Sequence, residues 1–152
     1  MNGKREGIRW ASNRTSAKNG LLPPTLESVR SLSLRNHLAL AALRTGNGNG
    51  HLLSDLIHVL YLSWYLREAG FGTADGALFR GAAAALERCA ALATAADVWQ
   101  VSGDDAAVLE RLLAVHDEQL ASTPVGVMHG AQKRIARFAR SDRRVPWQET
   151  GP

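Results

Sequence analysis

Four cations near the C-terminal end of the chain recur at helical spacing and could contact a row of phosphates. They are Lys133, Arg137, Arg140 and Arg144, separated by four, three and four residues. Because successive residues of an α-helix are rotated by about 100°, all four share one face, roughly opposite Ile135 and Phe138. A helix anchored through those two apolar side chains could hold its cations toward phosphate groups. The alternative is a solvated face whose positive charges interact favourably with the helix C-terminus.

The positive charge is concentrated at the two ends of the chain. Residues 1–20 hold five cations and Glu6, and residues 131–152 hold six cations with Asp142 and Glu149, so each end has a net charge of +4. The whole chain has +4, which leaves −4 for the middle. Such asymmetry indicates a polyanionic partner, although basic tails also serve solubility. We expect Arg143 to extend the contact, with auxiliary contacts from Lys4, Arg5, Arg9 and Arg14.

A helix-turn-helix motif would be another route to DNA. A helix over 53–69, the turn Gly70-Phe71-Gly72 and a following helix have the right order. The second helix of such a motif needs polar side chains that reach base edges. Here it offers Gly81 and four alanines, and its long polar side chains before the next alanine run are Arg80, Glu87 and Arg88. This composition favours contact with the phosphate backbone over base reading.

One helical face carries three possible metal ligands: His51, Asp55 and His58, spaced by four and three residues. Zinc or iron would need a further ligand, which His116 or His129 could supply. No signature such as His-Glu-x-x-His accompanies them, and a histidine in an apolar helix is more often a hydrogen-bonded core residue. We therefore expect no metal and no cofactor, and a metal-dependent enzyme is the least favoured of the functions considered.

Other residues that could do chemistry have simpler explanations. His116, Asp117 and Glu118 are adjacent, so on a helix they point about 100° apart and cannot form one site alone. His116 continues the apolar face of Leu109, Leu112 and Leu113, which predicts a buried or half-buried side chain. The glycines of residues 46–50 follow a helix rather than a strand and lack the Lys-Ser/Thr ending of a phosphate loop, so they predict a turn. We expect no enzymatic activity.

The hydrophobic pattern predicts an all-α protein, a single compact bundle of about five helices with a basic N-terminal arm and a basic C-terminal helix and tail. The helices are expected over about 25–45, 51–69, 75–96, from Ser102, and from Thr123-Pro124 onward. Ser31 and Ser33 could split the first, in which Leu34, Leu38 and Ala41 (or Ala42) recur at helical spacing. The connector 97–101 is expected to bury Trp99. The domain boundaries predicted are 1–22 for the arm, 23–141 for the bundle and 142–152 for a tail that frays.

The expected helix over 51–69 is apolar nearly all round. A helix without a polar face is usually the centre of a bundle or part of an oligomer interface, so a homodimer is possible. Its most apolar stretch, Leu52 to Leu66, is shorter than the ~20 residues that a spanning helix needs and contains Asp55 and His58. The chain has one cysteine, Cys89, and no signal-peptide pattern. These features predict a cytoplasmic protein without membrane contact.

Part of the sequence resembles a known group of proteins. The run from Leu34 to Gly48, then Trp99, His116 to Leu120 and Ser122-Thr123-Pro124, is similar in type and order to small helical proteins of prophages and plasmids of β-proteobacteria. Some of these are labelled Fis-like regulators. The resemblance covers about residues 30–140 and implies a helical body and a mobile-element origin. It carries over no catalytic residue.

We therefore expect a non-enzymatic binding protein from a phage or plasmid. Its basic ends would engage DNA or RNA, or a host complex that handles nucleic acid, as a regulator or as an inhibitor of host defence such as an anti-CRISPR. A protein-binding or self-assembling helical module without nucleic-acid contact is the alternative.

Overall fold

Helix α3 (Gly50–Glu68) forms the centre of the protein in the computed structural model, which describes residues 20–141 and 145–148. It contacts all four of the other α-helices of the described chain. Leu53, Leu62 and Tyr65 are buried on different sides of this helix, whereas Ile57 and His58 leave one side of its N-terminal half exposed. Most of the apolar surface is therefore used inside the bundle, which confirms the prediction of a central helix.

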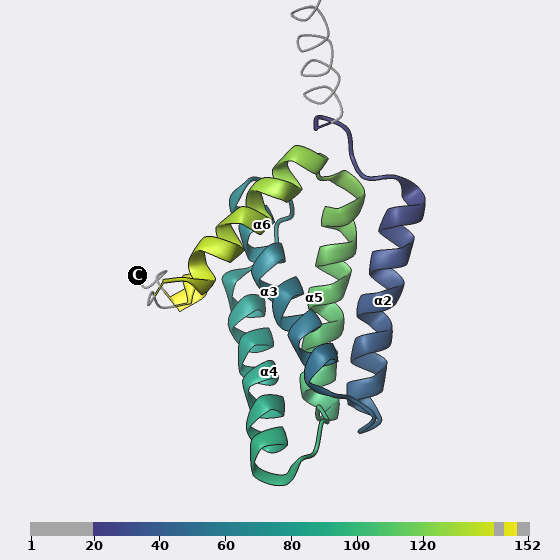
Figure 1. Ribbon diagram of the computed structural model, residues 1–152, viewed down its shortest axis with the longest axis vertical. Helices are drawn as coiled ribbons and strands as arrows, with labels where there is room; N and C mark the ends of the chain where they lie inside the picture. Colours follow the sequence, from purple (N-terminus) through teal and green to yellow (C-terminus); the bar gives the residue numbers. More distant parts are fainter. Residues whose placement is uncertain (1–19, 142–144, 149–152) are drawn as a thin grey trace, which may run out of the picture.

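The other helices surround α3. They are α2 (Leu26–Arg44), α4 (Gly76–Ala96), α5 (Gly103–Ser122) and α6 (Val125–Ala139), followed by the short 3₁₀ helix η1 (Pro146–Gln148). Helices α2 and α4 both lie against α5, whereas α6 crosses obliquely over α3 (Figure 1). No strand occurs in the described residues, and the all-α bundle of five helices is confirmed. None of these helices combines the length and the apolar character needed to cross a membrane.

Side chains fix where most of the helices begin. Thr25, Asn49, Asp75 and Ser102 each accept a hydrogen bond from a backbone N–H of the first helical turn, at 3.0–3.3 Å. These bonds satisfy amide donors that have no partner within the helix. The cap at Ser102 was predicted, and the turn between α2 and α3 lies where its glycines indicated. A Cβ at Gly48 would overlap the side chain of Leu43, so that turn requires a glycine there.

The start of α6 is satisfied differently. Pro124 supplies no side-chain cap; the N–H groups of Val125 and Gly126 donate to the carbonyls of Leu22 and Gly20, at 2.9 and 2.8 Å. A Cβ at Gly126 would lie 2.9 Å from the Gly20 carbonyl oxygen, which explains the small residue. The chain just before α2 is thus hydrogen-bonded to α6, the helix that carries Lys133 and Arg137.

Two details of the first helix differ from the prediction. Helix α2 runs without a break through Ser31 and Ser33. Leu34 and Leu38 are 61% and 60% exposed, and the buried face is instead made by Asn36, Ala39, Leu40 and Leu43. This orientation also brings Arg35 and Arg44 to the carboxylates of Asp55 and Glu110, and His37 to within 2.8 Å of Asp117 Oδ2. Helical spacing alone could not choose between two apolar faces.

Two tryptophans also differ from expectation. Trp99 is half-buried, with its ring against Gly50, rather than fully buried. Trp147, in the segment expected to fray, is only 4% exposed. Its ring packs against Tyr61 and Trp64, with centroids 4.8 and 6.2 Å apart. The described part of the tail therefore contributes to the core.

Candidate functional site

Helix α6 is anchored to the bundle along one side. Met128 and Ala131 are buried, and Ile135 and Phe138 are half-buried against the core. The Phe138 ring lies 5.3 Å from that of Tyr61, centroid to centroid. This is the apolar stripe that the sequence predicted, and it fixes which side of α6 faces solvent.

The solvent side of α6 carries exposed cations. Lys133, Arg137 and Arg140 are exposed, and within the described chain none of them forms an ion pair. Arg134 differs, because its Nη2 lies 2.7 Å from Glu68 Oε2 and its guanidinium lies 4.3 Å from the centre of the Tyr65 ring. Helix α6 ends at Ala139 with Arg140 as its C-cap. The remaining predicted contacts, Arg143, Arg144, Lys4, Arg5, Arg9 and Arg14, lie outside the described residues.

A shallow hollow lies beside these cations. It has a volume of about 380 Å³ and is lined by Tyr65, Arg134, Arg137, Phe138 and Ser141. Two guanidinium groups and two aromatic rings thus border one open space. Guanidinium groups suit phosphate because their planar N–H donors can bind two of its oxygens at once.

The helix-turn-helix alternative does not fit the packing. Ala82, Ala83 and Ala85 of α4 are buried in the core rather than presented at the surface. Arg88 is held by Asp105, with Nη2–Oδ1 and Nε–Oδ2 distances of 2.6 and 3.0 Å. The alanine-rich face of α4 is therefore used for helix packing.

The three candidate metal ligands do not form a cluster. The carboxylate of Asp55 accepts two hydrogen bonds from Arg35, at 2.6 and 3.3 Å, while His51 lies exposed. Among the residues that the structure describes, no group of three or more His, Cys, Asp or Glu side chains could hold a metal ion.

Consecutive residues of α5 point in different directions, as predicted. His116 is 2% exposed, and its Nδ1 lies 2.9 Å from Ser63 Oγ. Burial lowers the pKa of His116 to about 4, so its ring is neutral at pH 7. Asp117 instead lies toward α2, where its Oδ2 is 2.8 Å from His37 Nε2.

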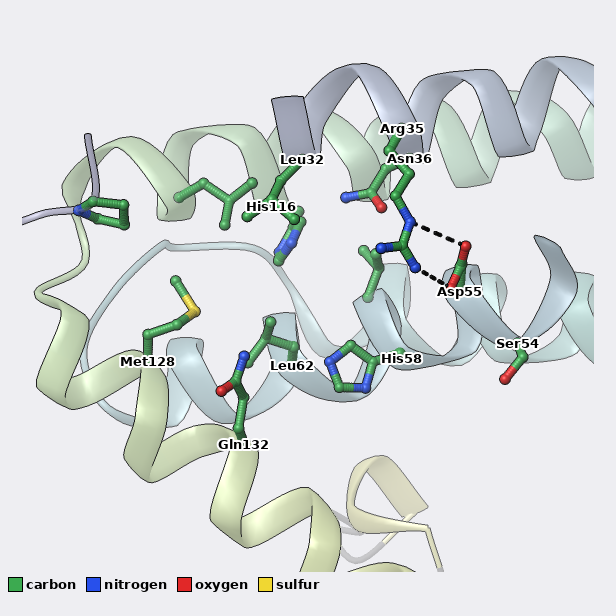
Figure 2. A pocket seen from close by; sticks show the side chains of 13 residues that line it. Leu32, Arg35, Asn36, Ser54, Asp55, His58, Leu62, His116, Met128 and Gln132 are labelled. Carbon is green, nitrogen blue, oxygen red and sulfur yellow. Dashed lines mark hydrogen bonds and ion pairs between the residues drawn. The ribbon is translucent and has the colours of Figure 1, made fainter. Parts of the chain in front are cut away.

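A partly open cavity lies between α2, α3, α5 and α6 and was not predicted from the sequence. Its volume is about 490 Å³, and its lining includes Asn36, His58, His116 and Gln132 (Figure 2). These polar residues are far apart in the sequence and follow no common spacing. The one signal that could have been noticed is Asn36, an amide with low helix propensity between apolar residues of a helix.

Comparisons with protein-family models, with curated proteins and with solved structures found no match. The resemblance to prophage and plasmid proteins therefore stays a prediction.

Proposed function

We propose that this protein is a non-enzymatic binding protein that contacts the phosphate backbone of nucleic acid through the outer face of α6. The observation that carries the proposal is the set of three exposed cations without ion pairs in the described chain, Lys133, Arg137 and Arg140, on a helix fixed from its opposite side. The hollow between Arg134 and Arg137 adds a place for a phosphate group.

The charge arrangement supports backbone contact rather than base reading. Exposed cations on a fixed helix can neutralise successive phosphates, which releases condensed counterions and gives affinity without sequence preference. Helix α4 gives base reading little support, since its alanine-rich face is buried and the exposed Arg88 is held by Asp105. The finer proposals follow from the sequence. The protein would be cytoplasmic and encoded by a phage or plasmid, and it would act as a regulator that binds nucleic acid or as an inhibitor of a host complex that handles nucleic acid.

The direct test compares two charge-reversed variants in binding to a labelled random-sequence duplex across a salt series. In Arg137→Glu/Arg140→Glu, both changes fall on the proposed surface. In the matched control Arg80→Glu/Arg111→Glu, two other exposed arginines without ion pairs in the described chain undergo the same change in net charge. We expect the first variant to lower the salt-dependence slope by about 2, since each phosphate contact contributes about 0.9.

The control should keep the wild-type slope and most of the affinity. Equal weakening of both variants would show that net charge alone attracts DNA, and the assignment to α6 would then be wrong. Unchanged binding by a folded Arg137→Glu/Arg140→Glu protein would reject the site as well. An absence of duplex binding at low salt would direct the search to protein partners.

A second function, self-association, is favoured by a different observation. The sequence suggested self-association because the helix over 51–69 is apolar nearly all round, but most of that surface of α3 is buried inside the bundle. Helix α2, however, exposes Leu34 and Leu38 one turn apart, and Leu26 is 63% exposed on the same helix. Sedimentation velocity of the wild type and of Leu34→Gln/Leu38→Gln tests this: a monomeric wild type at high concentration would exclude it.

A further inference from the structure

The cavity of about 490 Å³ is bounded by side chains from four helices. Leu32 and Asn36 come from α2, His58 from α3, His116 from α5, and Met128 and Gln132 from α6. Figure 2 shows the amides of Asn36 and Gln132 and the rings of His58 and His116 turned toward the same space. The size falls within the range of about 300–1,000 Å³ typical of small-molecule sites.

Asn36 is the most informative residue of this cavity. It is only 7% exposed, and its side-chain amide forms no hydrogen bond with another residue of the described chain. Its neighbours on the buried face of α2 are Ala39, Leu40 and Leu43. Its amide atoms are not among the described side-chain atoms that are both fully buried and unpaired, so they border the open space of the cavity. Asparagine is a poor helix former, so helix stability does not explain this residue, whereas pairing with a ligand in the cavity does.

The polar groups of the cavity carry no uncompensated charge at neutral pH. The rings of His116 and His58 both have lowered pKa values because burial disfavours their charged forms. The one charged pair, Arg35 with Asp55, is joined by two hydrogen bonds. A charged ligand would have to leave water without meeting a free counter-charge, which is unfavourable. The cavity therefore suits an uncharged molecule.

The remaining lining requires an apolar body on that molecule. Leu32, Leu62, Leu120 and Met128 border the same space as the two amides. An Asn or Gln amide presents a donor beside an acceptor, so it can pair with a heterocycle edge that offers the complementary acceptor and donor. Flat, mostly apolar heterocycles with such an edge include the nucleobases.

We propose that this cavity binds an uncharged heterocycle of the nucleobase type, paired through the amide of Asn36 and enclosed by Leu32, Leu62 and Met128. The site is separate from the outer face of α6. Met128 and Gln132 line the cavity from that helix, whereas Lys133 and Arg137 do not, and the buried Met128 lies nearly opposite Arg137. The two proposals can therefore fail independently.

The experiment uses saturation-transfer NMR on the full chain with the four common ribonucleosides as probes, and with benzene and a nucleoside 5′-monophosphate as comparison ligands. The variant Leu32→Trp places a large ring at a partly exposed position of the cavity wall. Its matched control is Leu92→Trp, the same change at a leucine of α4 that is 41% exposed, against 42% for Leu32, and lies outside the cavity lining. Circular dichroism establishes that both variants fold.

We expect at least one nucleoside to bind the wild type and Leu92→Trp, and not Leu32→Trp. Replacement of the pairing amide in Asn36→Leu should weaken binding about ten- to a hundredfold. Asn36→Leu also decides the result if Leu32→Trp fails to fold.

The proposal is overturned if no nucleoside binds, if Asn36→Leu binds as the wild type does, or if binding survives in a folded Leu32→Trp protein. Benzene binding alone would show an apolar cavity without the proposed pairing. Binding of only the monophosphate would place the ligand on the cations of α6.

Discussion

Two buried amides, Gln119 on α5 and Asn36 on α2, show how differently two regions of this interior are built. Gln119 is 1% exposed, and its Nε2 donates to the carbonyls of Ser63 and Phe71, both at 2.9 Å. Asn36 is almost as deeply buried and has no such bond within the described chain. The region around Gln119 holds α5, α3 and the turn after α3 together. The region around Asn36 leaves its hydrogen bonds available, as a binding site does.

The largest expected effect is acid destabilisation through His116, which lies one turn before Gln119 on α5 and also lines the cavity. The folded protein lowers the pKa of this ring from 6.5 to about 4, so the unfolded chain binds the proton more readily. Stability is therefore complete above pH 6.5 and is lost as the pH falls toward 4. At about 1.4 kcal/mol per pH unit, the free energy of unfolding should fall by about 3 kcal/mol. Urea unfolding near pH 7 and near pH 4.5 measures this loss.

The control for the acid effect is His116→Gln, which removes the titrating ring and keeps a polar group near Ser63. Its stability should change much less between the two pH values. Asp105 also makes the protein acid-sensitive, because the hydrogen bond from Arg88 lowers the pKa of its carboxyl below 3.8. That stability is present above pH 3.8 and is lost only at lower pH, outside this window. An equal loss in the wild type and in His116→Gln would show that another group is responsible.

The next effect is the loss of the Gln119 amide itself. Gln119→Leu should lower the free energy of unfolding by about 2 kcal/mol, because the buried carbonyl of Ser63 and the half-buried carbonyl of Phe71 both lose a donor. The acceptor Oε1 has no partner in the described chain, so its removal offsets only part of the cost. Urea unfolding of Gln100→Leu is the comparison, since Gln100 is exposed and its bond to the Arg44 carbonyl is long, at 3.4 Å. Similar stabilities for the two variants would contradict the structural role of Gln119.

Much of this fold was predictable from the sequence because helix formation and burial leave local patterns. The central position of α3 follows from its apolar residues on all sides, and the start of α5 follows from Ser102 as a cap. The burial of His116 follows from its spacing to Leu109 and Leu112. The orientation of α2 was not predictable, since it depends on where Asp55 and Asp117 lie on other helices.

The candidate sites differ in the same way. The anchored stripe of α6 and its opposite cations come from one helix, so their spacing gives their arrangement. The cavity is made by residues of four helices, and Asn36, His58, His116 and Gln132 come from four different helices, so no local spacing brings them together. The role of Gln119 was missed for the same reason, because its partners are 56 and 48 residues away.

The smallest expected effect is that of Asn36→Leu on stability, and it separates the region around Asn36 from the region around Gln119 most clearly. Asn36→Leu should leave the free energy of unfolding within about 0.5 kcal/mol of the wild type, or raise it, because no hydrogen bond to the described chain is lost and leucine is the better helix former. The same replacement at Asn49 should cost about 1 kcal/mol, because its Oδ1 accepts the 3.0 Å hydrogen bond that caps α3. Thermal and urea unfolding of the two variants give the comparison. A loss of about 2 kcal/mol in Asn36→Leu would place Asn36 with Gln119 among the structural amides and remove the reason to assign it a ligand. If Asn36→Leu leaves the free energy of unfolding unchanged, the stability of the fold does not explain this asparagine, whereas pairing with a ligand does.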